Sequence, residues 1–244
     1  MATSLQLDFS DLYEEVEKYL GTYAAGSASA GDVTDAKFIV NRAYLRLLNA
    51  HDWTFLRRYA SLITEDGKDV YDLPSDFGYM IEDRFTFSDD DSYIWTESRP
   101  LNWLRNRRSS LSWSNYPQYH AVHPGSYTKE AGQRWQVMFY PTPDSAYTLR
   151  YVYRAYPEKL VNDTDLPAGG PEASDVLLEA CLAYAEAYKD ETQAVHESKV
   201  QQIIAPLVDI DARRRPKVLG SLGPRVYQYG RGVVIEGGSL TVLS

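Results

Sequence analysis

The side chains that could do chemistry in this sequence do not fall into the pattern of a known catalytic or metal site. His120 and His123 are three residues apart, but no cysteine or cluster of carboxylates accompanies them to complete a set of metal ligands. The acidic run at 89–91 lacks the alternating ligands, the central glycine and the distal glutamate of a calcium loop. We therefore expect neither a metal site nor any other cofactor.

Two carboxylates, Asp72 and Asp76, flank Pro74 and are candidates for hydrolytic chemistry. A glycan hydrolase needs one carboxylic acid that an apolar cleft keeps protonated, beside a second carboxylate that is ionised. The run Asp72-Leu73-Pro74-Ser75-Asp76 is more typical of a turn. The sequence therefore favours a protein without catalytic residues, with a glycan or peptidoglycan hydrolase as an alternative.

The remaining reactive side chains have structural interpretations. Cys181 lies on the apolar stripe of a predicted helix without a neighbouring base, which is typical of a buried structural thiol. It is the single cysteine, so no disulfide can form within the chain and a reducing compartment is expected. We expect His51 near the surface at a helix end, and His196 on a solvated helix face.

The composition indicates a globular protein with an acidic surface. The chain has 244 residues, 44% of them hydrophobic, and a formal net charge of -9. That charge argues against non-specific DNA binding through a basic patch. No signal segment and no apolar run of membrane-spanning length is found, so no membrane partner is expected. The 20 tyrosines suit half-buried strands or an extensive protein–protein surface, and both interpretations stay open.

Apolar residues at three- and four-residue spacing predict two helices at the start of the chain, over 8–24 and 34–51. Thr34 is expected to cap the second helix. Phe38 is expected to pack on Val33 as a hydrophobic staple. The two helices are predicted to form an antiparallel pair.

From Trp53 the apolar period changes from that of a helix to that of a strand. Asp66-Gly67 lies between two strand-like runs and predicts a hairpin. A short helix with arginines near its end is predicted over 100–115. We expect this part of the chain to form a β-sandwich or a strongly bent antiparallel sheet inserted between helices.

The chain becomes helical again after Pro171. Ser174 is expected to cap a helix whose apolar stripe includes Tyr184 and Tyr188. A last helix ends at Arg213-Arg214-Arg215-Pro216. The glycine-rich tail that follows carries short β-prone apolar runs, so we expect an extended arm that adds strands to a neighbour, with a self-packed tail as the alternative.

These patterns predict an α+β protein in four parts. They are an N-terminal helical hairpin over 1–52, an inserted antiparallel β-sandwich-like region over 53–160, C-terminal helices over 161–216 that complete a bundle, and an extended C-terminal arm over 217–244.

Motifs that mark strand entries and turns follow one another along this chain: Trp53-Thr54-Phe55-Leu56, Val70-Tyr71-Asp72-Leu73-Pro74, Tyr151-Val152-Tyr153, Pro157-Glu158-Lys159-Leu160 and Leu166-Pro167. Over roughly 8–215 their order resembles the head-to-tail adaptor proteins of short-tailed bacteriophages. These are also called connector, head-completion or tail-tubular proteins. None of the motifs is a catalytic fingerprint.

The resemblance implies a structural virion protein at the capsid–tail junction, made in the host cytoplasm. It implies a ring, typically of twelve copies, that binds the portal protein, continues the DNA channel and holds the tail nozzle or tail fibres. Twelve copies would carry a formal charge of about -108, twelve times -9, which favours the passage of DNA without specific binding. Carried onto this chain, the portal contact is expected at the last helix and the arm, on Arg213, Arg214, Arg215, Arg225, Tyr227, Val233, Val234 and Ile235.

A third interpretation is a carbohydrate- or receptor-binding β module. It requires tryptophans whose rings are exposed for stacking on sugars, and burial is the commoner fate of this residue. The candidates are Trp95, Trp103, Trp113 and Trp135.

Overall fold

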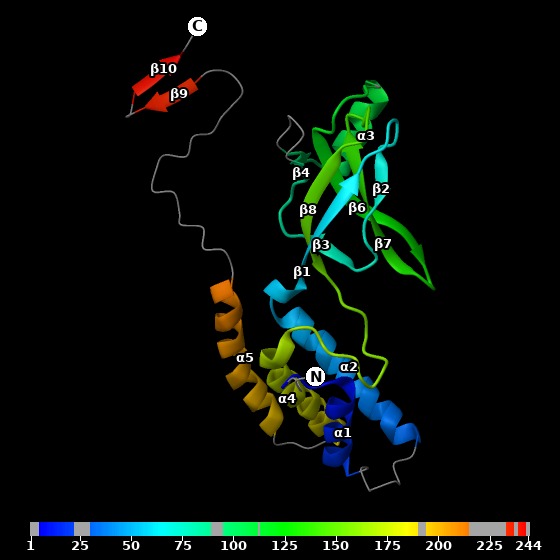
Figure 1. Cartoon of the computed structure of the whole chain (residues 1–244), viewed down its shortest axis with the longest axis vertical. Helices are drawn as coiled ribbons and strands as arrows, with labels where there is room; N and C mark the ends of the chain where they lie inside the picture. Colours follow the sequence, from blue (N-terminus) through cyan, green and yellow to red (C-terminus); the bar gives the residue numbers. More distant parts are fainter. Residues whose placement is uncertain are drawn as a thin grey trace.

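A computed structural model describes residues 5–21, 30–88, 95–111, 113–189 and 194–214. For 30–32, 233–236 and 239–242 it describes the backbone alone. The fold is α+β, as predicted. Figure 1 shows four helices gathered at one end and the strands with a short helix at the other.

The first two helices form the predicted pair, with different starts and ends. α1 spans Phe9–Leu20. Asp8 caps it by accepting a hydrogen bond from Asp11 N at 2.9 Å, and Gly21, with φ +78°, ends it because glycine adopts this left-handed conformation without strain. α2 spans Ala30–Ala50 and begins a turn before Thr34, so the predicted cap at Thr34 is wrong.

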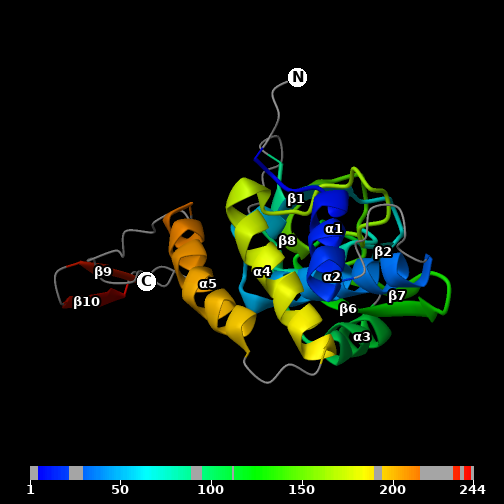
Figure 2. The same cartoon turned by 90° about the horizontal axis from the view of Figure 1, so that it is seen from below.

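The last two helices complete the bundle. α4 spans Gly170–Tyr188 and α5 spans Val195–Arg214. Ser174 lies inside α4 rather than at its cap, and its Oγ accepts a hydrogen bond from Leu7 N at 3.3 Å. α4 packs against α1, α2 and α5, and Figure 2 shows α5 and α1 on opposite sides of it. The apolar core between these helices includes Leu12, Val40, Leu47, Leu177, Cys181 and Leu207.

The strands form two four-stranded sheets rather than one bent sheet. In the first sheet β8 (Thr148–Ala155) pairs on one side with β1 (Arg57–Ile63) and on the other with β3 (Phe77–Met80) and β4 (Thr86–Phe87). The second sheet has the order β2 (Val70–Asp72), β7 (Gly132–Tyr140), β6 (Tyr119–Thr128) and β5 (Glu97–Ser98).

An aromatic core lies between the two sheets, and a smaller core lies under the short helix α3 (Leu101–Ser110). All pairings between the named strands are antiparallel except that of β5 with β6. The turn at Asp66-Gly67 joins β1 to β2, and these strands belong to different sheets, so the predicted hairpin there is wrong. The turn instead carries the chain from one sheet to the other, which closes the sandwich.

The two ends of the molecule meet where α2 runs into the short 3-10 helix η1 (Thr54–Leu56). The last carbonyls of a helix lack partners within it. Trp53 Nε1 donates to Leu47 O at 2.7 Å, and Arg154 of β8 donates to Leu48 O. Arg154 is buried, and its guanidinium lies over the ring of Tyr79. The β-rich region is thereby fixed to the end of α2.

Candidate assembly surface

The end of α5 carries two of the predicted portal contacts. Arg213 and Arg214 lie in its last turn and are exposed. Arg214 Nη2 lies 2.5 Å from Glu172 Oε2 of α4, but both side chains are more than 40% exposed, at 49% and 42%. Solvent screens such a pair, so it contributes little to stability and both arginines remain accessible.

The other predicted portal contacts follow α5 along the chain, and all of them except Arg215 lie in the arm. Two adjacent strands, β9 (Val233–Glu236) and β10 (Ser239–Val242), form a separate antiparallel sheet. Val233, Val234 and Ile235 belong to β9, whereas Arg215, Arg225 and Tyr227 lie outside the described residues.

A buried carboxylate fixes the exit point of the arm. Asp211, one turn before the end of α5, is 2% exposed. Its Oδ1 accepts hydrogen bonds from Thr54 N at 2.9 Å and from Thr54 Oγ1 at 2.6 Å. His51 Nε2 lies 3.5 Å from Oδ2, and the His51 ring packs edge-on against Trp53. The end of α5 is therefore held against η1, beside the start of β1.

A second buried carboxylate fixes the other end of α5. Glu186 of α4 accepts hydrogen bonds from Val195 N at 2.8 Å and from His196 N at 3.1 Å, two of the free amides of the first turn. His196 is half-buried, because its Nδ1 lies 2.7 Å from Glu179 Oε2 and its ring packs on Tyr19. The predicted solvated position of His196 is therefore wrong.

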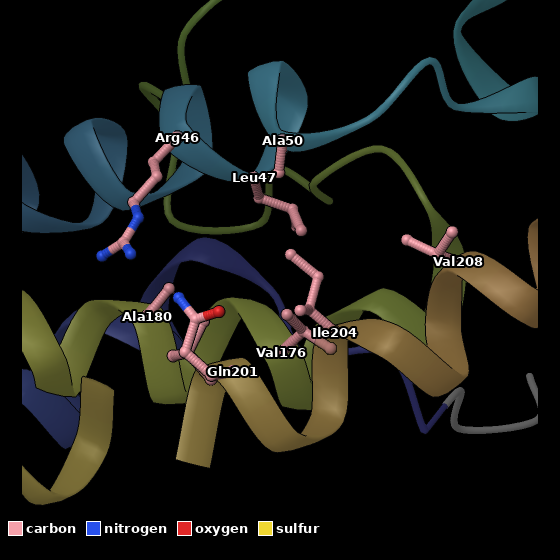
Figure 3. A pocket seen from close by; sticks show the side chains of 9 residues that line it. Arg46, Leu47, Ala50, Val176, Ala180, Gln201, Ile204 and Val208 are labelled. Atoms are coloured by element: carbon pink, nitrogen blue, oxygen red, sulfur yellow. The ribbon is translucent and has the colours of Figure 1, made fainter. Parts of the chain in front are cut away.

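α5 leaves part of the α2–α4 pair uncovered, and a hollow of about 300 Å³ opens there (Figure 3). Arg46 closes one side of it through a two-bond ion pair with Glu197, at 2.7 and 2.5 Å. This guanidinium holds the pKa of the Glu197 carboxyl below its usual range. The other walls are largely apolar and comprise Leu47, Ala50, Val176, Ala180, Val200, Gln201, Ile204 and Val208.

A second hollow, also of about 300 Å³, continues along α2 toward its N-terminus. Tyr184 contacts an arginine from each hollow. The guanidinium of Arg42 lies 5.5 Å from the centre of its ring, and that of Arg46 lies 5.8 Å from it. Phe38 and Tyr188 line the second hollow and are 63% and 62% exposed. Phe38 therefore points outward rather than forming the predicted staple.

We call the two hollows together with the exposed Leu45 the α2 groove. Leu45 is 53% exposed on the same helix, one turn after Arg42. Exposed large apolar side chains grouped around a hollow are typical of an interaction site. The sequence places Tyr188 on the apolar stripe of α4, but only the packing of α5 shows that this part of the stripe stays open.

A different apolar group lies on the side of the bundle that α1 covers. Leu5, Val161 and Leu166 are exposed by 89%, 58% and 55% and make up what we call the α1 face. The loop over 160–165 pairs with the start of α1, because Phe9 N donates to Asp165 O and Ser10 N donates to Asp163 O, both at 2.9 Å.

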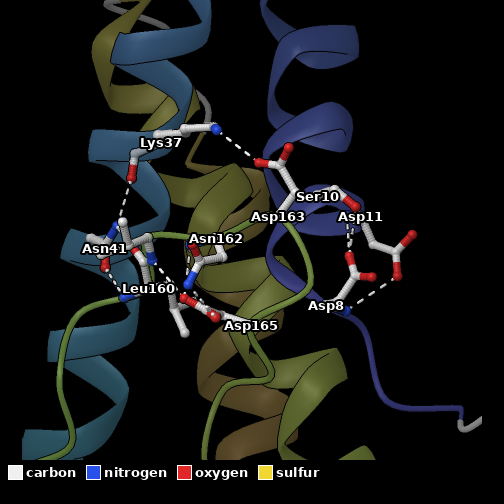
Figure 4. Close-up of polar contacts among 10 residues, drawn as sticks. Asp8, Ser10, Asp11, Lys37, Asn41, Leu160, Asn162, Asp163 and Asp165 are labelled. Atoms are coloured by element: carbon white, nitrogen blue, oxygen red, sulfur yellow. Dashed lines mark hydrogen bonds and ion pairs between the residues drawn. The ribbon is translucent and has the colours of Figure 1, made fainter.

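The loop of the α1 face is held by polar contacts from α2, which Figure 4 shows. Lys37 Nζ lies 2.8 Å from Asp163 Oδ1, and Asn41 bonds both backbone groups of Leu160. Asp165 accepts from the amides of Val161 and Asn162 at 2.8 Å, and these bonds hold the pKa of its carboxyl below its usual range. The result is an ordered, acidic surface with protruding apolar side chains.

The chemical candidates take structural positions. His120 is fully buried; Thr96 Oγ1 lies 2.8 Å from its Nδ1, and burial lowers its pKa to about 4. Burial likewise raises the pKa of the Cys181 thiol, as expected of a structural cysteine. Among the described residues no group of three histidine, cysteine or carboxylate side chains is arranged to hold a metal. The run at 89–91 includes residues outside the described ranges.

The two hydrolase candidates, Asp72 and Asp76, accept hydrogen bonds from different side chains. Asp72 is exposed and accepts a hydrogen bond from Gln136 Nε2 at 2.8 Å. Asp76 accepts from the Tyr153 hydroxyl at 2.9 Å. Each carboxylate is thereby bonded to a different sheet, Asp72 to β7 and Asp76 to β8.

The four tryptophans do not share one exposed surface. Trp103 packs edge-on against Tyr119 and Tyr140, and Trp135 packs on Phe77 of the aromatic core. Trp95 and Trp113 are 49% and 42% exposed. The residues required by a sugar-stacking surface are therefore partly used in packing.

Comparison with known proteins agrees with the structural interpretation. No curated protein matches the chain. No described helix is long and apolar enough to cross a membrane. The sequence profile of the SU10 adaptor protein family matches residues 7–222, which include both helical pairs and the β-rich region between them. The match covers most of the chain, and this protein belongs to the SU10 adaptor family, whose members are structural proteins of bacteriophage virions.

Proposed function

We propose that this protein forms a ring, of twelve copies, beneath the portal protein, and that the ring joins the capsid to the tail. The observation that carries the proposal is the α2 groove, a partly apolar surface on a chain with an acidic net charge of -9. A closed ring needs two different, complementary surfaces on each subunit. The α2 groove and the α1 face supply such a pair.

The two surfaces are complementary in shape. The α2 groove is hollow and carries both the exposed Arg42 and the exposed Asp35, whereas the α1 face protrudes, with Asp11 of α1 exposed beside it. Figure 2 places α5, which borders the groove, and α1 on opposite sides of α4. We infer that Leu5, Val161 and Leu166 of one copy enter the α2 groove of the next.

The portal contact is proposed at the end of α5 and in the arm. Arg213 and Arg214 are exposed where α5 ends, and Asp211 fixes that end against η1. Arg215 and the arm residues Arg225, Tyr227, Val233, Val234 and Ile235 are proposed to extend this contact. In this arrangement the β-rich region is left for the nozzle or the tail fibres.

The ring proposal is tested by placing charge in the α2 groove. We expect Phe38→Glu combined with Leu45→Glu to prevent full rings on the portal, because burying two new carboxylates at an apolar contact is unfavourable. Both positions are exposed in the single chain. Each substitution should therefore change the free energy of unfolding by no more than about 0.5 kcal/mol, as is usual for surface positions.

The readout is the number of adaptor copies for each portal ring, measured by mass. A matched control is Tyr127→Glu, an equally exposed aromatic residue at 71% on the β6–β7 hairpin, which should leave the ring intact. Complete rings from the groove variant would contradict the proposal.

A further inference from the structure

β1 is the longest strand at the edge of a sheet in the described part of the chain. It has seven residues and pairs only with β8. The edge strands of the second sheet, β2 and β5, have three and two residues. A long free edge is a template for pairing with another strand.

The outward backbone groups of β1 can be assigned from its register. Thr64 N donates to Tyr147 O at 3.0 Å, and the β1–β8 register continues from this pair. Because bonded and non-bonded pairs alternate in an antiparallel ladder, Tyr59, Ser61 and Ile63 direct their N–H and C=O groups away from β8. The described residues provide no backbone partner on that side.

Beyond Arg57 and Arg58 at its start, the edge lacks the usual protection against pairing. β1 contains no lysine, no proline and no bulge against β8. Tyr59 and Ile63 are 86% and 62% exposed on the outer face of the sheet. A strand of this kind is expected to be covered in the assembled protein.

We propose that β1 accepts β9 from the arm of a neighbouring copy as an additional strand. The inference rests on the proposed ring and states how one subunit holds the next. The hairpin of β9 and β10 forms a sheet of its own, so β9 also has one free edge.

The position of the arm favours this occupant. The arm begins at the end of α5, which Asp211 holds against η1 immediately before β1. Residues 215–232 separate α5 from β9 and can span at most roughly 60 Å. A neighbouring copy whose β1 lies within that distance can accept β9. Within one chain β1 and the hairpin belong to separate sheets, which favours the neighbour over the same chain.

Charge suggests the register. β1 begins with Arg57 and Arg58, and β9 ends with Glu236. Antiparallel pairing that sets Glu236 opposite Arg58 sets Val233 opposite Ser61, and opposite charges across a strand pair are stabilising. Strand addition uses the backbone groups of β9. The side chains of Val233, Val234 and Ile235 can therefore still take part in the proposed portal contact.

Disulfide cross-linking tests this register in the full-length protein on the portal. Two populations are mixed, one carrying Ser61→Cys and the other Val233→Cys, and are oxidised mildly. Paired residues on adjacent strands lie within the Cα separation that a disulfide spans. The native Cys181 is fully buried and does not compete.

We expect a cross-linked dimer from this mixture and its loss when Val233→Cys is replaced by Val234→Cys, because alternate residues of a strand face opposite sides. Arg58→Glu in the protein that carries Ser61→Cys should reduce the amount of dimer. Adding Glu236→Arg to the protein that carries Val233→Cys should restore it.

The inference would be overturned by equal cross-linking at both positions of β9, or by the absence of a dimer although the adaptor binds the portal in full number. A cross-link formed only within single chains carrying both cysteines would show that the arm pairs with its own β1 and would also overturn it. Failure to bind the portal at all would instead reject the proposed function.

Discussion

Buried carboxylates set the position of α5, and Asp211 shows how one residue can control a surface at some distance from it. Its two hydrogen bonds from Thr54, at 2.9 and 2.6 Å, hold the end of α5 where Arg213 and Arg214 emerge. The sequence shows Asp211 only as one more acid in a helix. Its partner lies 157 residues earlier in the chain, so spacing along the helix gives no signal of the contact.

We predict that Asp211→Ala lowers the free energy of unfolding by about 2–3 kcal/mol, because it removes two hydrogen bonds to a charged acceptor and leaves the Thr54 donors without it. Denaturant unfolding measures this. The matched control is Asp209→Ala, an exposed acid on the same helix, which should change stability by no more than about 0.5 kcal/mol. Equal effects of the two variants would count against the role of Asp211.

His120 predicts a dependence of stability on pH. Burial lowers its pKa to about 4, although Asp83, whose carboxylate lies 3.5 Å away, partly offsets this. Between pH 6.5 and 4 the unfolded chain therefore takes up a proton that the folded chain does not. The contribution of neutral His120 to the free energy of unfolding is therefore complete above pH 6.5. About 3 kcal/mol of it is lost as the pH falls toward 4.

Unfolding free energies measured across this pH range check the prediction. His120→Gln replaces the imidazole by a side chain that does not titrate. Between pH 6.5 and 4 the slope of unfolding free energy against pH should then fall by the amount that uptake of one proton causes, about 1.4 kcal/mol per pH unit, whatever the change in absolute stability. An unchanged slope would assign the pH dependence to other groups.

At the scale of elements, periodicity predicted the four bundle helices and the main strands, because each buries one face of a regular element. It failed where a local signal has two meanings. Asp66-Gly67 is a genuine turn, yet whether the flanking strands pair depends on β7 and β8, which lie far along the chain. His196 was misplaced because its partners Glu179 and Tyr19 come from other helices.

A glycine in the first sheet gives a test of how closely its strands are packed. A Cβ on Gly78 of β3 would lie 2.6 Å from the Tyr156 ring and 2.9 Å from Arg154 O, and the backbone oxygen cannot move aside. We predict that Gly78→Ala costs about 1–3 kcal/mol of unfolding free energy.

Gly125→Ala is the comparison for this prediction, because the nearest atoms there belong to the flexible side chain of Gln136, at 2.8 Å. Thermal or denaturant unfolding should show a smaller loss for Gly125→Ala than for Gly78→Ala. The reverse order would mean that the β3–β8 contact adapts more readily than its geometry indicates.

At the scale of the whole molecule, the sequence predicted an α+β protein and a resemblance to head-to-tail adaptors, and the match over 7–222 confirms the family. The predicted boundaries at 52 and 160 remain predictions. The α2 groove could not be predicted, because Phe38 was assigned to a hydrophobic staple and Tyr188 to an apolar stripe, and both of these normally pack against other side chains. Their exposure depends on how much of α2 and α4 the helix α5 covers.

In the proposed role the protein lies between capsid and tail, its bundle forms the ring contacts, and the end of α5 and the arm engage the portal. An acidic net charge of -9 for each copy suits a channel through which DNA passes without being held. These roles together require that the protein bind a portal ring in defined number.

The most direct test is the mass of the full-length protein mixed with portal rings from the same virion, compared with a variant that lacks 217–244. We predict a complex with one adaptor for each portal subunit, and loss of that complex on removal of the arm. Absence of binding to a well-formed portal ring, or full binding without the arm, would contradict the account.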